Sequence, residues 1–250
     1  MRRFAVCLLL IILGLCVLAP LVAPDDPLHA VTRGELQPPS LRHPLGTDLL
    51  GRDVWSRVLY GGRATLLAAV TALSLALVFG TVLGLIAGLG GQAIDGTITM
   101  ITNVLLAFPV LLFALLIILI IGTGIFQVAV AVGLAGVPPV IVVTRSAVRN
   151  ALGQPYIEAA RSLGATRLQI GWRHVLPNIA PTLRAFGVVI LSWALMNAAT
   201  LNFLGLGGET AQPEWGSMLA QARITFARAP WTVIAPGLAI MITVCAVNLL

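Results

Sequence analysis

Long runs of apolar residues alternate along this chain with shorter polar segments. Each run is continuously apolar over about 20 residues, the length that an α-helix needs to cross the hydrocarbon core of a bilayer. A transmembrane β-strand would instead alternate over roughly 10 residues. The pattern therefore predicts an all-α integral membrane protein with about six transmembrane helices. They are expected at about 4–23, 64–89, 97–121, 125–143, 182–204 and 231–250.

The same pattern divides the chain into three parts. Residues 1–23 form the first transmembrane helix, 24–63 an extracytoplasmic segment, and 64–250 a five-helix core with a cytoplasmic loop at about 144–181. The first apolar run follows two arginines, as in a cleavable signal peptide. It is longer than the apolar part of such peptides, and proline follows each candidate cleavage site, so we expect an uncleaved helix.

Two spans carry residues with a specific meaning for packing. Gly80, Gly84 and Gly88 form a ridge of small residues at a spacing of four, which lets another helix approach the backbone closely. This ridge predicts a packed interface, either within the chain or between subunits. Pro109 interrupts the third span and leaves a carbonyl unpaired one turn earlier, which predicts a kink.

The charged residues limit the function classes. All 15 basic residues are arginine, and the net charge is +6. A phosphate-binding loop needs a lysine, so this chain cannot build one. If nucleotide energy drives the protein, ATP and Mg²⁺ are bound by another chain, and no cofactor is expected in this one. The arginines form no basic stripe with stacking aromatics, so nucleic acid is not an expected partner.

Catalytic and metal-binding motifs are missing from the spans. The three histidines lie outside them, and neither H-E-x-x-H nor G-x-S-x-G occurs, so we expect no catalytic residue, no metal site and no enzyme activity. An ion-coupled secondary transporter would carry ionisable residues within its helices. The central portions of the predicted spans contain no acidic residue, which favours an external source of energy.

The arginine distribution indicates an orientation. Six spans place both termini on the same side as the 144–181 loop, and this side carries a net charge of about +6 against about zero on the other. Arginine counts of eight against seven barely decide the orientation under the positive-inside rule, and the net charge decides it better, so we expect both termini and the loop in the cytoplasm.

A polar, arginine-rich stretch at 156–181 predicts two short helices. Pro155 suits a first helical turn, and Gly164 can take the left-handed conformation that ends a helix. Thr166 and Gln169 fit a capping box that begins a second helix, which Pro177 should end. Physical chemistry alone leaves two interpretations open: a knob that docks into a partner protein, or an interfacial helix on anionic lipid headgroups. The expected outer surface combines Glu158, Ala159, Ala160, Arg161 and Leu163.

Several separated motifs resemble one family. Glu158-Ala159-Ala160, then Gly164, then Leu176-Pro177 is similar to the E-A-A loop of bacterial ABC importer permeases, with His174 in place of the usual isoleucine. Arg-His-x-Leu-Pro-Asn at 173–178 resembles the dipeptide, oligopeptide and nickel branch. Further matches to this branch lie at 43–54, 60–63, 201–207 and 213–216.

The resemblance implies a MetI-like type I importer permease fold and a role for each motif residue. Glu158 would anchor the loop on a separate ATPase subunit, Ala159 and Ala160 would allow close approach, and Gly164 would make the bend. Arg161, Leu176 and Pro177 belong to the same coupling loop.

The resemblance also implies partners and a location. The partners are a homologous second permease in a heterodimer, two ATPase subunits, an extracytoplasmic substrate-binding protein and membrane lipid. Pro213, Glu214 and Trp215, in the 205–230 loop, would face the binding protein. The chain would be a multi-pass protein of a bacterial plasma membrane that forms half of a pathway for di- or oligopeptides, with nickel or a metal chelate as the alternative cargo.

Overall fold

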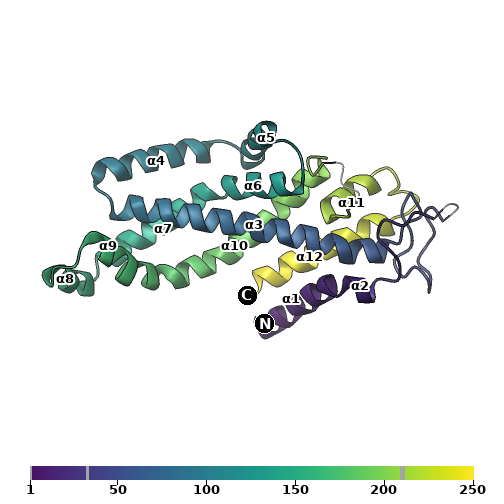
Figure 1. Cartoon of the computed structure of the whole chain (residues 1–250), viewed down its shortest axis with the longest axis horizontal. Helices are drawn as coiled ribbons and strands as arrows, with labels where there is room; N and C mark the ends of the chain where they lie inside the picture. The colour runs from purple at the N-terminus through teal and green to yellow at the C-terminus, as the bar shows by residue number, and fades with distance from the viewer. Residues whose placement is uncertain (1, 32–33, 209–211) are drawn as a thin grey trace. The chain divides into compact units, whose positions relative to one another are not determined.

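The computed structural model describes residues 2–31, 34–208 and 212–250 (Figure 1). Every regular element in these residues is a helix, which confirms the all-α prediction; the described residues add one isolated antiparallel bridge, Thr47 to Asp53. The helices are α1 (Arg2–Val17), α2 (Ala19–Val22), α3 (Val54–Leu89), α4 (Gln92–Ala107), α5 (Val110–Ile121), α6 (Ile125–Ala135), α7 (Val137–Leu152), α8 (Pro155–Ser162), α9 (Arg167–Gln169), the π-helix η1 (Ile170–Val175), α10 (Leu176–Phe203), α11 (Trp215–Ala222) and α12 (Trp231–Asn248).

The chain forms two compact units, which are described separately. The first unit consists of residues 1–71, 118–129 and 191–250, and the second consists of residues 72–117 and 130–190. Helices α3, α5, α6 and α10 each contribute residues to both units.

The six predicted spans correspond to six apolar helical elements, of which four meet the length for crossing a membrane. These four are Val54–Leu89, Ile125–Leu152, Arg167–Phe203 and Trp231–Asn248, and the bent pair of α4 and α5 makes a fifth if it counts as one span. The remaining element, α1, is apolar but has only 16 residues.

In the first unit, α3 begins at Val54 rather than at about residue 64. Asp53 starts the helix, because its Oδ2 accepts hydrogen bonds from the backbone N–H and the hydroxyl of Ser56, both at 2.7 Å. Gly61 and Gly62 belong to the predicted extracytoplasmic segment 24–63 but lie inside the helix. A Cβ at Gly62 would lie 2.8 Å from the Trp215 ring, so these glycines serve close packing.

The end of α1 is tied to α3 by one side chain. Pro20 has no backbone N–H, so the carbonyl of Cys16 loses its helical partner. Arg63 on α3 replaces that partner: its Nε donates to the Cys16 carbonyl and its Nη2 to the Val17 carbonyl, both at 2.6 Å. Since a buried or lipid-facing carbonyl must be paired, this arginine fixes where α1 ends.

In the second unit, α3 packs on α7 through the glycine ridge. Gly80 faces Val140, Gly84 faces Thr144 and Gly88 faces Val148. A Cβ on Gly84 would lie 2.5 Å from the Thr144 Cβ, closer than real carbon atoms approach. The ridge therefore forms a helix contact within the chain, with both helices in register at a spacing of four.

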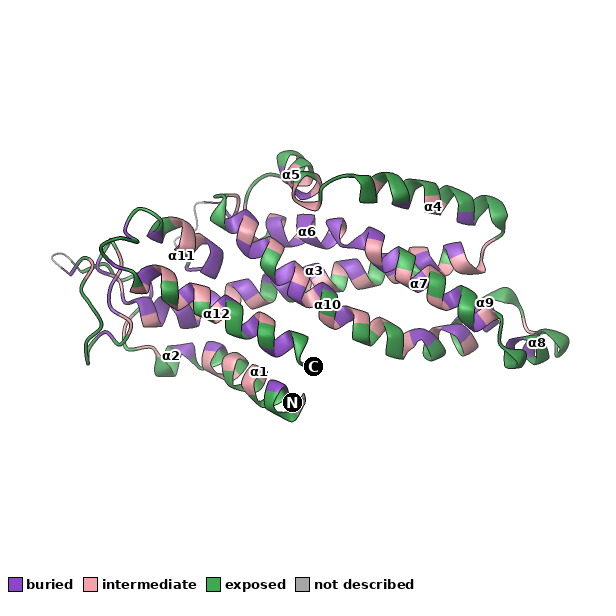
Figure 2. Cartoon of the chain, turned by 180° about the vertical axis from the view of Figure 1, so that it is seen from behind, coloured by how far each residue is buried: buried purple, intermediate pink, exposed green. Residues whose placement is uncertain are grey.

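Pro109 causes a break that is larger than a kink. Phe108 before it is extended, as residues preceding proline prefer, and α4 and α5 are bent by 98°. Most of α4 is exposed (Figure 2), whereas Asp95 in its first turn is buried.

The fourth span continues beyond its expected end at Val143. Helices α6 and α7 act as one apolar helix from Ile125 to Leu152. Residues 144–152 were expected to belong to the polar loop, but they form a regular helix, in which Arg145 and Arg149 lie four residues apart on one face and both pair with Asp95.

We expect Gly84→Ala to lower the unfolding temperature of the purified protein in detergent. The added methyl group overpacks the α3–α7 contact, which typically costs about 1–3 kcal/mol. Gly96→Ala is the matched control, because a Cβ at that exposed α4 position meets nothing within 4 Å. The control should unfold at the same or a higher temperature, since alanine favours helix over glycine by about 0.5–1 kcal/mol. Equal unfolding temperatures for the two variants would contradict the close approach.

Candidate functional site

Helix α8 is specified by the residues at its two ends. Pro155 occupies its first turn, and Glu158 lies there too, where a negative charge complements the helix dipole. At its other end the Gly164 N–H donates to the Arg161 carbonyl at 2.9 Å and the Ala165 N–H to the Ala160 carbonyl at 3.0 Å. This pair of bonds is a Schellman motif, and the φ of +83° at Gly164 is the left-handed conformation that it requires.

The next helix begins as predicted but does not end as predicted. Thr166 and Gln169 form the capping box: the Thr166 hydroxyl accepts from the Gln169 N–H at 3.3 Å, and the Gln169 side chain accepts from the Thr166 N–H at 2.9 Å. Pro177 was expected to end this helix, which is wrong. The helix widens into η1 and continues through Pro177 into α10, because a π-turn relieves the clash between the proline ring and the preceding turn.

The outer surface of this segment, residues 155–177, combines one acid with apolar side chains. Glu158, Ala159 and Arg161 are exposed, and no ion pair of Glu158 occurs among the described residues. Leu163, Leu168 and Trp172 are 89%, 81% and 72% exposed. Large apolar groups that stay this open beside a charged residue favour a surface that another molecule covers.

The inner surface of the segment rests on a buried cluster. Ile157 and Ala160 are buried, and Ile157 packs in a cluster formed by α7, α8, η1 and α10. The expectation that Ala160 lies on the outer surface is therefore wrong: it faces inward because it is two positions from Glu158 on the helix, and its small side chain lets α8 lie close to its base. Leu176 also packs against this cluster, whereas Pro177 is exposed.

A polar pocket of about 620 Å³ lies beside α8 in the second unit. Helix α7 contributes Ser146 and Asn150, and α10 contributes Asn178 and Thr182. Gln154 and Tyr156 line the pocket from the start of α8, and the Asn178 amide is hydrogen-bonded to the Tyr156 hydroxyl. The predicted coupling residues are thus direct neighbours of a solvent-accessible polar cavity that the sequence motifs did not indicate.

A second feature missed from the sequence is a buried acid with two arginines. Asp95 on α4 is 8% exposed, and its carboxylate pairs with Arg145 and Arg149 of α7, including a bond of 2.8 Å from Arg145 Nη2 to Oδ2. Burying a carboxylate beside apolar helices is costly unless it is paired. The arginine spacing of four was the available signal, since it places both charges on one helical face.

The residues expected to face a binding protein are buried instead. Pro213 is buried, and Glu214 and Trp215 are 1% and 2% exposed. Glu214 caps α11: its Oε2 accepts from the Ser217 N–H at 2.9 Å, and its Oε1 bonds the Thr65 hydroxyl at 2.8 Å. These side chains join the loop to α3 and are not exposed to a partner, while the expectation that the 205–230 loop faces a binding protein stays a prediction. The predicted 205–230 loop contains the helix α11, and its residues 209–211 lie outside the described part of the chain.

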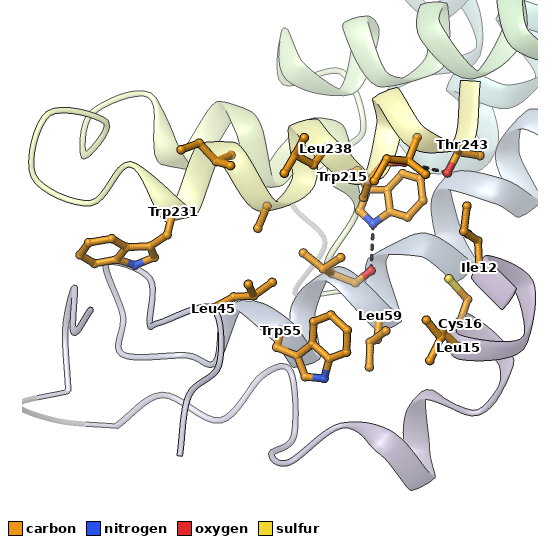
Figure 3. Close-up of a pocket in the computed structure, with 15 residues that line it drawn as sticks. Ile12, Leu15, Cys16, Leu45, Trp55, Leu59, Trp215, Trp231, Leu238 and Thr243 are labelled. Atoms are coloured by element: carbon orange, nitrogen blue, oxygen red, sulfur yellow. Dashed lines mark hydrogen bonds between the residues drawn. The ribbon is translucent and has the colours of Figure 1, made fainter. Parts of the chain in front are cut away.

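Trp215 also lines an apolar cavity of about 310 Å³ in the first unit (Figure 3). Its indole N–H donates to the Val58 carbonyl at 2.8 Å, the bond drawn in the close-up. Side chains of α1, α3 and α12, together with Leu45 from the segment before α3, form the rest of the wall. Among the described residues, no group of three or more His, Cys, Asp and Glu side chains is arranged to hold a metal ion.

Apolar helices of membrane length, packed through glycine and joined by an exposed capped segment, define a multi-pass membrane protein. Comparison with known proteins identifies its family. The chain belongs to the family described as the binding-protein-dependent transport system inner membrane component, whose profile matches residues 80–250.

Curated relatives resemble nearly the whole chain. It is 38% identical to the di/tripeptide transport system permease protein DppC of Pseudomonas aeruginosa, over 97% of this chain and 82% of the relative. It is 37% identical to the dipeptide transport system permease protein DppC of Alkalihalophilus pseudofirmus, over 94% of this chain and 78% of the relative. The chain is 41% identical to the glutathione transport system permease protein GsiD of Pectobacterium atrosepticum, over 85% of this chain and 70% of the relative. The family and fold predicted from the motifs are confirmed, and the chain is a transport permease of the bacterial cell membrane.

Glu214 predicts a pH-dependent stability. Burial raises the pKa of Glu214 above its ordinary value of 4.5, and hydrogen bonds from the backbone N–H groups of Ser217 and Gly216 offset part of that effect. At pH values between 4.5 and the raised pKa of the folded state, Glu214 keeps its proton in the folded protein and releases it in the unfolded chain. Stability is therefore lost as the pH rises through this window.

We expect Glu214→Gln to remove this dependence, because the amide stays neutral. The measurement compares the unfolding temperatures of the wild type and of Glu214→Gln from about pH 5 to about pH 8. The other titrating groups contribute equally to both curves, so their contributions cancel when one curve is subtracted from the other. A wild-type curve that runs parallel to the Glu214→Gln curve would contradict the assignment.

Proposed function

We propose that this chain forms half of the translocation pathway of an ATP-driven importer of small peptides. It is coupled to a separate ATPase subunit through the 155–177 segment. The support for the cargo is that the relatives at 35–41% identity carry names of dipeptide, di/tripeptide, peptide and glutathione transport permeases. The support for the coupling is the exposed surface of α8, which presents Glu158 beside large apolar side chains on a buried base.

The division of labour follows from the chemistry of this chain. Without lysine it has no phosphate-binding loop, so ATP and Mg²⁺ are bound by two partner ATPase subunits, and the permease itself catalyses no reaction. A homologous second permease completes the pathway, and an extracytoplasmic binding protein delivers the peptide. In this arrangement both chain termini and the 155–177 segment face the cytoplasm.

Energy transfer needs a rigid connection between the docking surface and the membrane helices. Helix α8 is held by the Schellman end at Gly164 and by the cluster around Ile157, and after the turn at 163–166 one helix runs without interruption from α9 through η1 into α10. Movement of the ATPase would therefore displace α10 together with α8. ATP binding acts through its different affinity for the two states of the permease pair.

We expect Glu158→Ala to lower ATP-driven peptide uptake about tenfold or more, because a hydrogen bond to a charged group contributes about 1.5–3 kcal/mol. The assay reconstitutes the complete transporter in proteoliposomes and measures uptake of radiolabelled trialanine together with ATP hydrolysis. Insertion and abundance of the variant should match the wild type.

Glu35→Ala is the matched control, since Glu35 is also an exposed acid but lies in the segment before α3. It should transport normally. Normal uptake by Glu158→Ala would refute the anchoring role, and failure of the wild-type complex to take up any peptide would refute the cargo.

A further inference from the structure

Helix α7 presents three different faces within the second unit. Val140, Thr144 and Val148 face the glycines of α3. Arg145 and Arg149 face α4 and are paired with Asp95. The third face carries Ser146 and Asn150, which are exposed and turn toward the polar pocket.

The pocket is uncharged, and its lining mixes polar side chains with the apolar side chains of Val142, Val143, Ala147, Ala151 and Ile179. Its lining includes six uncharged polar side chains and no arginine, because the two arginines of α7 are turned to Asp95. The polar side chains are Ser146, Asn150, Gln154, Tyr156, Asn178 and Thr182. Its volume of about 620 Å³ is of the size that binds small molecules, about 300–1,000 Å³.

Most of these side chains have unused hydrogen-bonding capacity. Tyr156 and Asn178 bond each other, whereas Ser146, Asn150 and Thr182 make no side-chain hydrogen bond within the described residues. The same holds for the Gln154 amide. Asn and Gln side chains each offer a donor and an acceptor, the same pair of groups that every peptide unit presents.

We infer that this pocket receives the backbone amides of the peptide as it leaves the pathway. The inference rests on the proposed function and deepens it, because it assigns a substrate-contacting site to α7 and α10. Side-chain amides and hydroxyls match peptide units of any sequence. They hold them more weakly than charged groups would, which suits a site that must release its cargo.

The position of the pocket connects it to the docking surface. Gln154 immediately precedes α8 and Tyr156 lies in its first turn, four residues or fewer from Glu158. The hydrogen bond from Asn178 to Tyr156 crosses from α10 to α8. A displacement of α8 therefore changes the shape of the pocket directly, without an intermediate element.

Photocrosslinking in the complete reconstituted transporter tests this site. A photoreactive benzoylphenylalanine replaces Asn150 in one variant and Asn248, an exposed position near the end of α12, in the control. The probe is radiolabelled trialanine. We expect a labelled adduct at position 150 and none at position 248.

Transport kinetics provide the second readout. Asn150→Leu should lower trialanine uptake by about two- to tenfold, the effect of one lost hydrogen bond, while substrate-stimulated ATP hydrolysis continues. Asn248→Leu should leave uptake unchanged. This result differs from that expected for Glu158→Ala, in which substrate-stimulated ATP hydrolysis should fall together with uptake because the contact with the ATPase is weakened.

Two outcomes would overturn the site. Crosslinking of position 150 to the second permease in place of trialanine would show that the pocket is a subunit interface. Equal uptake by Asn150→Leu and the wild type would show that the amide does not contact the peptide. A wild-type complex that takes up no trialanine would instead refute the proposed function itself.

Discussion

The close approach of α3 and α7 determines the arrangement of the second unit. Lipid is as apolar as leucine, so helices in a bilayer gain little from hydrophobic burial and depend on contact at short range. Three glycines allow this contact, and they fix the rotation of α7 about its own axis. Once that rotation is fixed, Arg145 and Arg149 must face α4, and Ser146 and Asn150 must face away from both neighbours.

The charged side chains of α7 are thereby separated from its uncharged polar side chains. Asp95 accepts both arginines of α7, which removes two strong anion-binding groups from the vicinity of the polar pocket. A transport pathway has to bind its substrate and also release it, and neutral hydrogen-bonding groups satisfy both needs better than an unpaired guanidinium would. The permease thus combines a charged, exposed surface on α8 with an uncharged cavity next to it.

The sequence predicted those features that depend on neighbouring residues. The capping box at Thr166 and the glycine end of α8 each involve residues within a few positions of one another, so a local pattern was sufficient. The helical role of Gly61 and Gly62 and the burial of Glu214 depend on Trp215 and Thr65, contacts more than a hundred residues apart in the chain. No local pattern carries that information, and tertiary packing overrode the turn and loop preferences.

The π-helix η1 changes which side of one long helix its residues reach. In an α-helix, positions seven apart lie on nearly the same face, so Trp172 and Ile179 should share an environment. Trp172 is 72% exposed and Ile179 only 3%. A π-turn holds about one residue more than an α-turn, so it rotates everything after it by about 100° relative to everything before it. One uninterrupted rod can therefore offer its first turns to a partner protein and its later turns to the interior of the permease.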